Sequence, residues 1–255
     1  MNLCLPTTGL DRYKSASQRA RICTESWGAA SLYCPACDSR RIDALPSGTH
    51  AADFACPSCL SRFQLKSKSS AFGTRVIDGA YVAMHRAILG DETPNLFLLH
   101  YQLPKLTVEN VLLIPHFVFT LSLLEKRKPL SASARRAGWV GCNFLLDRIP
   151  SEARIPMVQD GQPVSAAKVR KAYKKLRPLE KLNVQKRGWT LDVLQVVQSL
   201  GKLEFTLADV YAHADALAKL HPNNAHIRDK IRQQLQILRD LHLLIFLGSG
   251  SYRLI

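Results

Sequence analysis

Four cysteines in two pairs constrain the fold of this chain more than any other feature of its sequence. The pairs are Cys34-Pro-Ala-Cys37 and Cys56-Pro-Ser-Cys59, and eighteen residues separate them. Each pair predicts a tight turn that aims two thiolates at one point, and two such turns can place four sulfurs tetrahedrally around Zn²⁺. Because a closed four-sulfur site has no open position for chemistry, we expect a structural zinc site. Cys4, Cys23 and Cys142 are isolated, and we interpret them as small hydrophobic residues.

Paired cysteines indicate metal binding most strongly in a reducing compartment, and the sequence carries no sign of export. The N-terminus lacks the basic stretch and apolar run that a secretory signal requires. The most apolar run, Val111–Leu124, is shorter than a membrane-spanning helix and contains Pro115 and His116. We therefore expect a buried strand followed by a turn there, and a cytoplasmic protein with no membrane partner.

Charge is the next informative feature. Among 255 residues, 35 Lys and Arg against 20 Asp and Glu give a net charge of +15. This excess favours a polyanionic partner such as nucleic acid, although a merely basic protein is the alternative. The chain is otherwise 47% hydrophobic and 22% charged, which excludes a disordered, collagen-like or low-complexity protein.

A basic segment over residues 168–187 indicates a domain boundary near Pro178–Lys186. We therefore expect two domains, residues 1–183 and 184–255. In the first domain, helices are predicted over Ser15–Trp27 and Val76–Leu89. Strands are predicted over His50–Ala55, Arg62–Lys66, Asn95–Gln102 and Val108–Phe117. This mixture is typical of an α/β fold with a mixed sheet.

The second domain has the sequence pattern of three helices followed by a hairpin. The helices are predicted over Trp189–Leu200, Leu207–Leu220 and His226–Asp240. Thr206 and Asp209 form a capping box before the second helix, and a Gly-Ser-Gly turn at 248–250 joins the two strands. This order predicts a winged helix, whose third helix enters the major groove while the hairpin touches the backbone. A helical bundle with a solvated basic face is the alternative.

Three residues near the second cysteine pair could carry phosphodiester chemistry. Asp53 precedes that pair, and on the following predicted strand Gln64 and Lys66 share a face while Leu65 points to the core. If the two strands are neighbours, Asp53, Gln64 and Lys66 meet at one edge of the sheet. An acid near an acid-x-Lys pair is typical of Mg²⁺-dependent phosphodiesterases. On the pattern alone, a surface Asp and a surface Lys without function are the alternative.

Longer motifs accompany these residues. They are SQRARICTESW (17–27), the two CPxC pairs, ADF (52–54), LKSK (65–68), DGAY (78–81), KPLSASARRAGWVGCN (128–143), RGWTLDV (187–193), FTLADVYA (205–212) and IRDKIRQQLQILRD (227–240). With these motifs the chain resembles, nearly end to end, the DpnI-type methyl-directed restriction endonucleases, or Dam-replacing protein family. The resemblance implies a PD-(D/E)xK nuclease domain with an embedded zinc site, followed by a winged helix. It also implies cleavage of double-stranded GATC sites with N6-methylated adenines, with Asp53 binding Mg²⁺ and Lys66 as the catalytic lysine.

Gln64 departs from the family pattern, which has Glu at this position. An amide carbonyl can bind Mg²⁺, but the loss of a negative charge should lower the affinity of the site. Glu25, in the first predicted helix, could supply a compensating catalytic carboxylate or could be a solvated helical residue. The alternative function is therefore a protein that binds methylated DNA without cleaving it, or a winged-helix regulator.

Basic, amide and aromatic residues in two places are candidates for DNA contact. Arg135 and Arg136 could engage phosphate or guanine, and Trp139 could stack on bases or wedge between them. Alternatively, Trp139 is a core aromatic. In the winged helix the candidates for base edges are Arg228, Arg232, Gln233 and Gln236, and Arg253 is the candidate for phosphate. We expect a monomer whose partner is double-stranded DNA containing N6-methyladenine.

Overall fold

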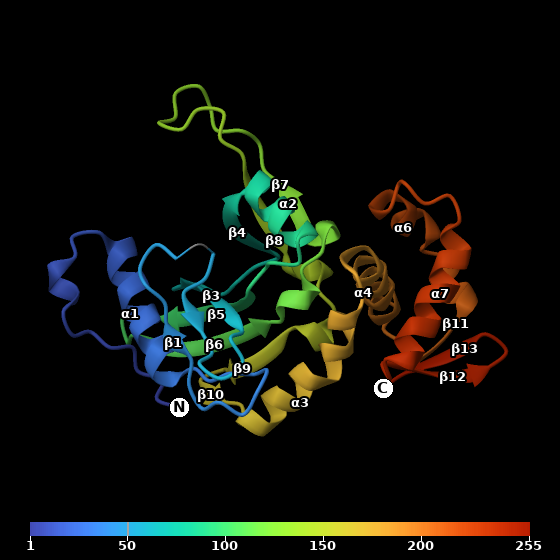
Figure 1. The fold of residues 1–255 in the computed structure, drawn as a ribbon, viewed down its shortest axis with the longest axis horizontal. Helices are drawn as coiled ribbons and strands as arrows, with labels where there is room; N and C mark the ends of the chain where they lie inside the picture. Colours follow the sequence, from blue (N-terminus) through green and yellow to red (C-terminus); the bar gives the residue numbers. More distant parts are fainter. Residues whose placement is uncertain (50) are drawn as a thin grey trace. The chain divides into compact units, whose positions relative to one another are not determined.

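The computed structural model describes residues 1–49 and 51–255 (Figure 1). The chain forms two compact units, each assembled from three stretches of sequence. The first comprises residues 1–73, 92–116 and 152–175, and the second comprises residues 74–91, 117–151 and 176–255. Short 3₁₀ turns occur at Leu10–Arg12, His116–Val118, Leu121–Leu123, Leu146–Arg148, Ser151–Ala153 and Arg177–Lys181.

A seven-stranded sheet forms the centre of the first unit. In spatial order its strands are β1 (Asp43–Ala44), β2 (Phe54–Ala55), β3 (Arg62–Lys68), β5 (Asn95–Gln102), β6 (Thr107–Ile114), β9 (Ile155–Gln159) and β10 (Gln162–Pro163). β3 and β5 are parallel, whereas the other neighbouring strands are antiparallel. The apolar run Leu96–Leu99 of β5 is at most 1% exposed, so this strand is buried on both faces, as a central strand requires.

Two helices, α1 (Ala16–Ser31) and α3 (Ala166–Leu176), complete the first unit. α1 packs beside β3, where the hydroxyl of Thr24 lies 3.0 Å from that of Ser67. Gly28 permits a close approach of α1 to β2, because a Cβ at this position would lie 2.8 Å from the ring of Phe54. The first helix is thereby fixed against the strands that carry the candidate active-site residues.

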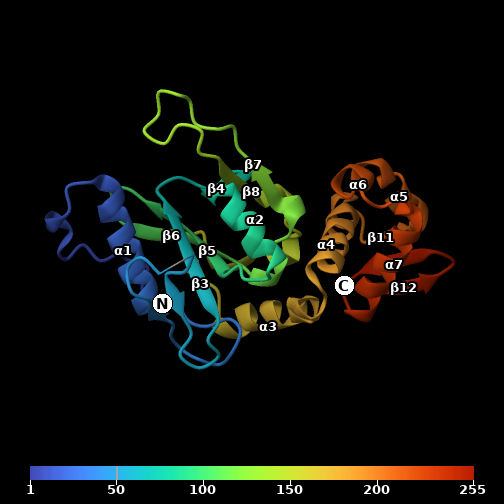
Figure 2. The ribbon, with the colours of Figure 1, turned by 45° about the horizontal axis from the view of Figure 1, so that its top comes forward.

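The second unit contains a small antiparallel sheet and a module of helices and strands (Figure 2). The small sheet has the order β4 (Arg75–Ala80), β8 (Gly141–Leu145) and β7 (Leu124–Lys126), and α2 (Tyr81–Leu89) directly follows β4. The module comprises α4 (Val184–Ser199), β11 (Glu204–Thr206), α5 (Leu207–Tyr211), α6 (Ala214–Leu220), α7 (Ile227–Asp240), β12 (Leu244–Gly248) and β13 (Ser251–Leu254). Its strands pair in the order β11-β13-β12, so the module is a winged helix rather than a bundle of helices alone.

The capping box and the apolar face of α7 agree with the sequence. The hydroxyl of Thr206 accepts a hydrogen bond from the backbone of Asp209 at 3.2 Å, while the Asp209 carboxylate accepts one from the backbone of Thr206 at 2.7 Å. The hydrogen bonds that the Thr206 backbone and hydroxyl donate to this carboxylate, with one from Lys202, lower the pKa of Asp209 to about 2. Along α7, Ile231, Leu235 and Leu238 are fully buried, which anchors this helix and leaves its opposite face exposed.

Three predicted elements are wrong in part. Val76–Leu89 is not one helix, because Val76 to Ala80 belong to β4, which pairs with a strand more than sixty residues later in the sequence. The strand expected over His50–Ala55 is only Phe54–Ala55, and His50 lies outside the described residues. The helix expected over Leu207–Leu220 is divided at Ala212–His213 into α5 and α6.

The apolar run over residues 111–124 has the predicted form of a buried strand and a turn. β6 ends at Ile114, and 3₁₀ turns follow it. In the part of the chain that the structure describes, no helix has both the length and the apolar character that a membrane crossing needs.

Candidate metal centres and DNA interface

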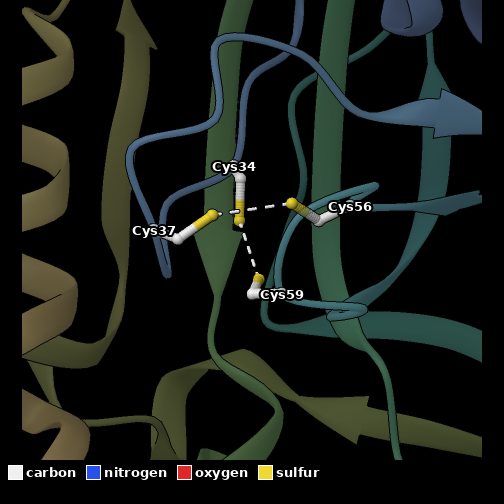
Figure 3. Close-up of side chains that lie close together, drawn as sticks. All are labelled: Cys34, Cys37, Cys56 and Cys59. Carbon is white, nitrogen blue, oxygen red and sulfur yellow. Dashed lines mark hydrogen bonds between the residues drawn. The ribbon is translucent and has the colours of Figure 1, made fainter.

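The four paired cysteines converge on one point. Figure 3 shows their sulfurs turned toward one another. The Sγ atoms of Cys34 and Cys59 lie 3.6 Å apart, as do those of Cys37 and Cys56, and all four sulfurs lie within 4.8 Å of one another. Sulfurs bound tetrahedrally at a zinc–sulfur distance of about 2.3 Å are roughly 3.8 Å apart. The cluster can therefore hold a metal such as zinc.

Backbone hydrogen bonds shape both turns. In the second pair, the N–H of Leu60 donates to the carbonyl of Cys56 at 3.0 Å, and the N–H of Cys56 donates to Ser61 at 2.9 Å. Leu60 has a φ of +62°, so the chain turns back tightly just after the last sulfur. The guanidinium of Arg170, on α3, donates to the carbonyl of Cys34 at 3.2 Å. The first turn is thus held by a helix far away in sequence.

The thiols of the cluster differ in acidity. Burial raises the pKa of Cys34 and of Cys37. Burial also acts against the Cys56 thiolate, but hydrogen bonds from the N–H groups of Cys59 and Ser58 and from the Cys37 and Cys59 thiols together lower the pKa of Cys56 to about 6. Four thiolates at this spacing would repel one another strongly, so a bound cation is what makes a fully deprotonated cluster stable.

Asp53 lies at the start of β2, against β3. Its N–H donates to the carbonyl of Phe63 at 2.8 Å, and its Oδ2 accepts a hydrogen bond from the N–H of Leu65 at 2.7 Å. The second bond places the carboxylate beside the stretch of β3 between Gln64 and Lys66. The Asp53 carboxylate is thus fixed to β3 at Leu65, the residue between Gln64 and Lys66.

Glu25 is held by a residue that the sequence analysis missed. Arg21, one turn earlier on α1, contacts the Glu25 carboxylate through Nε at 2.6 Å. This hydrogen bond raises the pKa of Arg21, and the negative charge of Asp53 raises it further. Arg21 thus links Glu25 electrostatically to Asp53. The spacing of four residues between opposite charges on a predicted helix was the available signal for this pair.

The cysteine cluster and the site around Asp53 differ in how many side chains they offer as metal ligands. Among residues 1–49 and 51–255, only the cysteine cluster brings three or more Cys, His, Asp or Glu side chains close enough to share one ion. No such group of three occurs around Asp53 within these residues, and residue 64 is a glutamine, not an acid.

The candidate DNA loop lies between β7 and β8, and it extends away from its sheet in Figures 1 and 2. Arg135 and Arg136 are exposed, and the guanidinium of Arg136 lies 4.6 Å from the centre of the Trp139 ring. Trp139 is half-buried and leans on Gly141, where a Cβ would lie 2.8 Å from the ring. Trp139 is therefore outside the apolar core, stacked with a cation at the base of the loop.

The candidate residues of the winged helix lie on its outer surface. On α7 the exposed residues include Arg228, Arg232, Gln233 and Gln236. The guanidinium of Arg228 lies 5.3 Å from the ring centre of Tyr211. In the wing, Arg253 donates to the carboxylate of Glu204 at 3.0 Å, so this arginine is engaged by an acid when no DNA is bound.

Two buried polar residues of α4, Arg187 and Asp192, have partners that were not predicted. Arg187 is fully buried and forms an ion pair with Asp91, just after α2. Asp192 accepts a hydrogen bond from Ser122 at 2.8 Å and lies 2.8 Å from Nε2 of His221. Because the partners are up to 96 residues apart, helical periodicity could not reveal them. These contacts attach α4 to the rest of the second unit.

The module over residues 184–255 has the helix-turn-helix type of fold that is common in DNA-binding proteins, and it follows an α/β region. The net charge of +15 favours such a polyanionic partner. Comparison with family models identifies the family. The DpnI model, described as the Dam-replacing family, matches residues 1–182, and the model of the Dam-replacing HTH domain matches residues 185–254. The chain belongs to the Dam-replacing family, and the resemblance found in its motifs is confirmed.

Proposed function

We propose that this chain is a methyl-directed type II restriction endonuclease, a Mg²⁺-dependent deoxyribonuclease. Its substrate is double-stranded DNA with GATC sites whose adenines carry N6-methyl groups. In this proposal a monomer acts in the cytoplasm, with a PD-(D/E)xK catalytic domain over residues 1–183 and a winged helix over residues 184–255. The observation that carries it is the 2.7 Å bond that holds the Asp53 carboxylate beside Gln64 and Lys66. Membership of the Dam-replacing family supports it.

Asp53 and Gln64 would hold the catalytic Mg²⁺, because a carboxylate and an amide carbonyl both offer the hard oxygen atoms that this ion prefers. The ion would supply charge stabilisation at the scissile phosphate. Lys66 shares a face of β3 with Gln64, so its ammonium group stabilises negative charge developing on that phosphate or orients the attacking water. Glu25 contributes negative potential from α1, in competition with Arg21.

The cysteine cluster would hold a structural zinc ion through Cys34, Cys37, Cys56 and Cys59. Asp53 is three residues before Cys56, so a rigid turn at the cluster also fixes the end of β2 that presents the acid. The proposed role of zinc is therefore positional, and all four ligands are supplied by the protein.

DNA reading in this proposal is divided between two elements. The N6 group of adenine lies in the major groove, where a methyl group removes a donor hydrogen and adds apolar surface. α7 would enter this groove with Arg228, Arg232, Gln233 and Gln236, while Arg253 contacts phosphate. Arg135 and Arg136 would contact phosphate or guanine near the cut, and Trp139 would stack on a base.

Digestion of one plasmid isolated from methylating and non-methylating hosts tests this function directly. With Mg²⁺ we expect fragments only from the methylated plasmid, and with EDTA none from either. Asp53→Asn keeps an oxygen to accept the bond from Leu65 but removes the charge, so it should abolish cleavage and leave binding intact. Equal cleavage of both plasmids would contradict methyl direction, and cleavage by Asp53→Asn would contradict the assigned site.

Gln64 favours a second candidate function, a methylated-DNA reader that does not cleave. The site has one carboxylate in place on the sheet, and an amide stands where the family pattern has an acid. This candidate predicts tighter binding to the methylated plasmid, equal in Mg²⁺ and in EDTA, and no fragments at any Mg²⁺ concentration.

A further inference from the structure

A recess of about 390 Å³ opens on the sheet of the first unit. Across the strands, Lys66 is in register with Leu98, Leu98 with Leu112, and Leu112 with Pro156. Residues paired in this way point to the same face of a sheet. Leu98, Leu112 and Pro156 line the recess, so it lies on the face that carries Lys66. At a spacing of about 4.8 Å per strand, β6 is roughly 10 Å across the sheet from β3.

The recess has an apolar floor and a polar rim. Its apolar lining residues, called the floor below, include Leu98, Leu112, Pro156 and Val158, and its polar lining residues, called the rim, are His100, Asn110, Arg154 and Gln159. Asn110 is held in place, because its Oδ1 accepts a hydrogen bond from the N–H of Asp160 at 3.0 Å. Its Nδ2 lies 3.4 Å from Nδ1 of His100. The amide N–H₂ is thus fixed at the rim.

Positively charged side chains lie at and beside the recess. Arg154 is exposed at the rim, and the ammonium of Lys68 lies 5.0 Å from the centre of the Phe72 ring, which also lines the recess. No Asp or Glu occurs among the lining residues that belong to the described part of the chain. Lys68, His100 and Asn110 are paired across β3, β5 and β6. They form the next row of side chains on this face, because Lys68 is two residues after Lys66 on β3. The recess therefore suits an anion that also has an apolar surface.

We propose that this recess binds one sugar–phosphate unit of the DNA backbone next to the cleaved position. Its phosphate would meet Arg154, Asn110 and the cations of the same row, and the apolar side of its deoxyribose would lie on the floor. This inference rests on the proposed function, since it places DNA across the Lys66 face. Asn110 lies on β6, about 10 Å across the sheet from β3, so the contact would reach a neighbouring phosphate, not the scissile one. Arg154 is thus a positioning residue.

Binding of a short duplex, followed by fluorescence anisotropy in EDTA over a range of salt concentrations, tests the role of Arg154 without requiring cleavage. Arg154→Gln should weaken binding about tenfold, because it removes a charge-assisted hydrogen bond. The slope of log K against log salt should fall by about one, equally for methylated and unmethylated DNA. Arg154→Lys should restore most of the loss. Arg12→Gln removes the same charge from an exposed site outside the recess and should change neither quantity.

A series of duplexes, each with one neutral methylphosphonate, identifies the contacted phosphate. At one position the unmodified protein should lose about tenfold in affinity, and Arg154→Gln should lose nothing further there. The inference would be overturned if Arg154→Gln left the affinity and the salt slope unchanged. It would also be overturned if the losses caused by the methylphosphonate and by Arg154→Gln added up at every phosphate. Displacement of the duplex by millimolar dAMP that depends on Arg154 would overturn it too, because it would indicate a site for free nucleotide.

The outcomes for the recess and for the proposed function are separable. If the protein binds and never cleaves, yet the Arg154 result holds, the inference stands and the nuclease function falls. If the protein cleaves normally and Arg154→Gln behaves like the unmodified chain, the inference falls alone. A chain that binds no DNA under any of these conditions would overturn both.

Discussion

Two sites formed by neighbouring segments of the first unit differ in how their polar groups are satisfied. In the cysteine cluster, the four sulfurs lie within 4.8 Å of one another and face a common point. In the Asp53 site, each acid already has a protein partner: Asp53 accepts from Leu65, and Glu25 is paired with Arg21. The first site can hold a cation among its four sulfurs, whereas the acids of the second site have partners within the protein.

This difference determines what each site can contribute. A cluster of thiols that needs an ion transfers the free energy of metal binding to the stability of the fold. A site whose acids are satisfied by the protein contributes little to stability through its metal, so its ion can be weak and exchangeable. Loss of a ligand should therefore damage folding at the cysteines and damage activity at Asp53.

Removal of zinc should have the largest effect. Cys56→Ser, or prolonged treatment with a strong chelator, should lower the free energy of unfolding by more than about 4 kcal/mol, because a buried ligand and its ion are lost together. Thermal unfolding measures the change, and metal analysis should find one zinc per chain before treatment and none after it. Cys23→Ser is the matched control, since Cys23 is buried but remote from the cluster in sequence. If the metal-free chain were equally stable, the cysteine cluster would not contribute to folding through a bound metal.

Asp53→Asn should show the opposite pattern. The amide oxygen can still accept the bond from Leu65, so the unfolding temperature should stay close to that of the unmodified protein. Cleavage of methylated DNA should fall on the order of 100-fold or more, because the carboxylate that would hold the catalytic Mg²⁺ is lost. Single-turnover cleavage at saturating DNA separates this loss from any change in binding. A loss of stability comparable with that of Cys56→Ser would show that the two sites are not distinct in this way.

Patterns of neighbouring residues were sufficient to predict the elements whose structure depends on short-range interactions. The two turns of the cysteine pairs follow from Cys-x-x-Cys spacing, and the capping box at Thr206 and Asp209 is closed as its motif predicts. The β-rich run of Asn95–Gln102 and the helix–hairpin order of the winged helix also follow from composition and period. In each case the information lies within about fifteen residues.

Features with distant partners could not be predicted in this way. Val76–Ala80 became a strand because β8, far along the chain, offers it a partner. The burial of Arg187 depends on Asp91, and the recess depends on the register among β5, β6 and β9. For the candidate active site, the sequence placed Asp53 near Gln64 and Lys66 but did not reveal that Arg21 holds Glu25.

Restoring the missing acid should sharpen the contrast between the sites. Gln64→Glu adds a carboxylate beside Asp53, so the Mg²⁺ concentration for half-maximal cleavage should fall about tenfold. The zinc content should not change. Gln102→Glu, which adds the same charge at the end of β5, is the matched control. If Gln64→Glu leaves the Mg²⁺ dependence unchanged, residue 64 is not a ligand. If cleavage appears only in Gln64→Glu, the natural chain is the reader without cleavage.

The smallest effect is expected at Arg21. Arg21→Gln removes an exposed ion pair from α1 while keeping a good helix former, so the free energy of unfolding should fall by no more than about 0.5 kcal/mol. The Mg²⁺ requirement should nevertheless fall about two- to threefold at low salt, because a positive charge near Asp53 and Glu25 is gone, and the gain should shrink as salt screens it. Arg19→Gln, on the same helix, is the control.

The double variant Arg21→Gln/Glu25→Gln shows whether the lower Mg²⁺ requirement of Arg21→Gln depends on Glu25 or on Asp53. If Glu25 becomes a ligand once Arg21 releases it, the double variant should lose the whole gain. If Arg21 acts only through its potential at Asp53, the gain should persist when Glu25 is neutral. The first outcome would mean that the ion pair with Arg21 keeps Glu25 from binding Mg²⁺ in place of the acid that is absent at residue 64. The second would leave Asp53 as the single functional acid of the site, against the four cysteine ligands of the cluster.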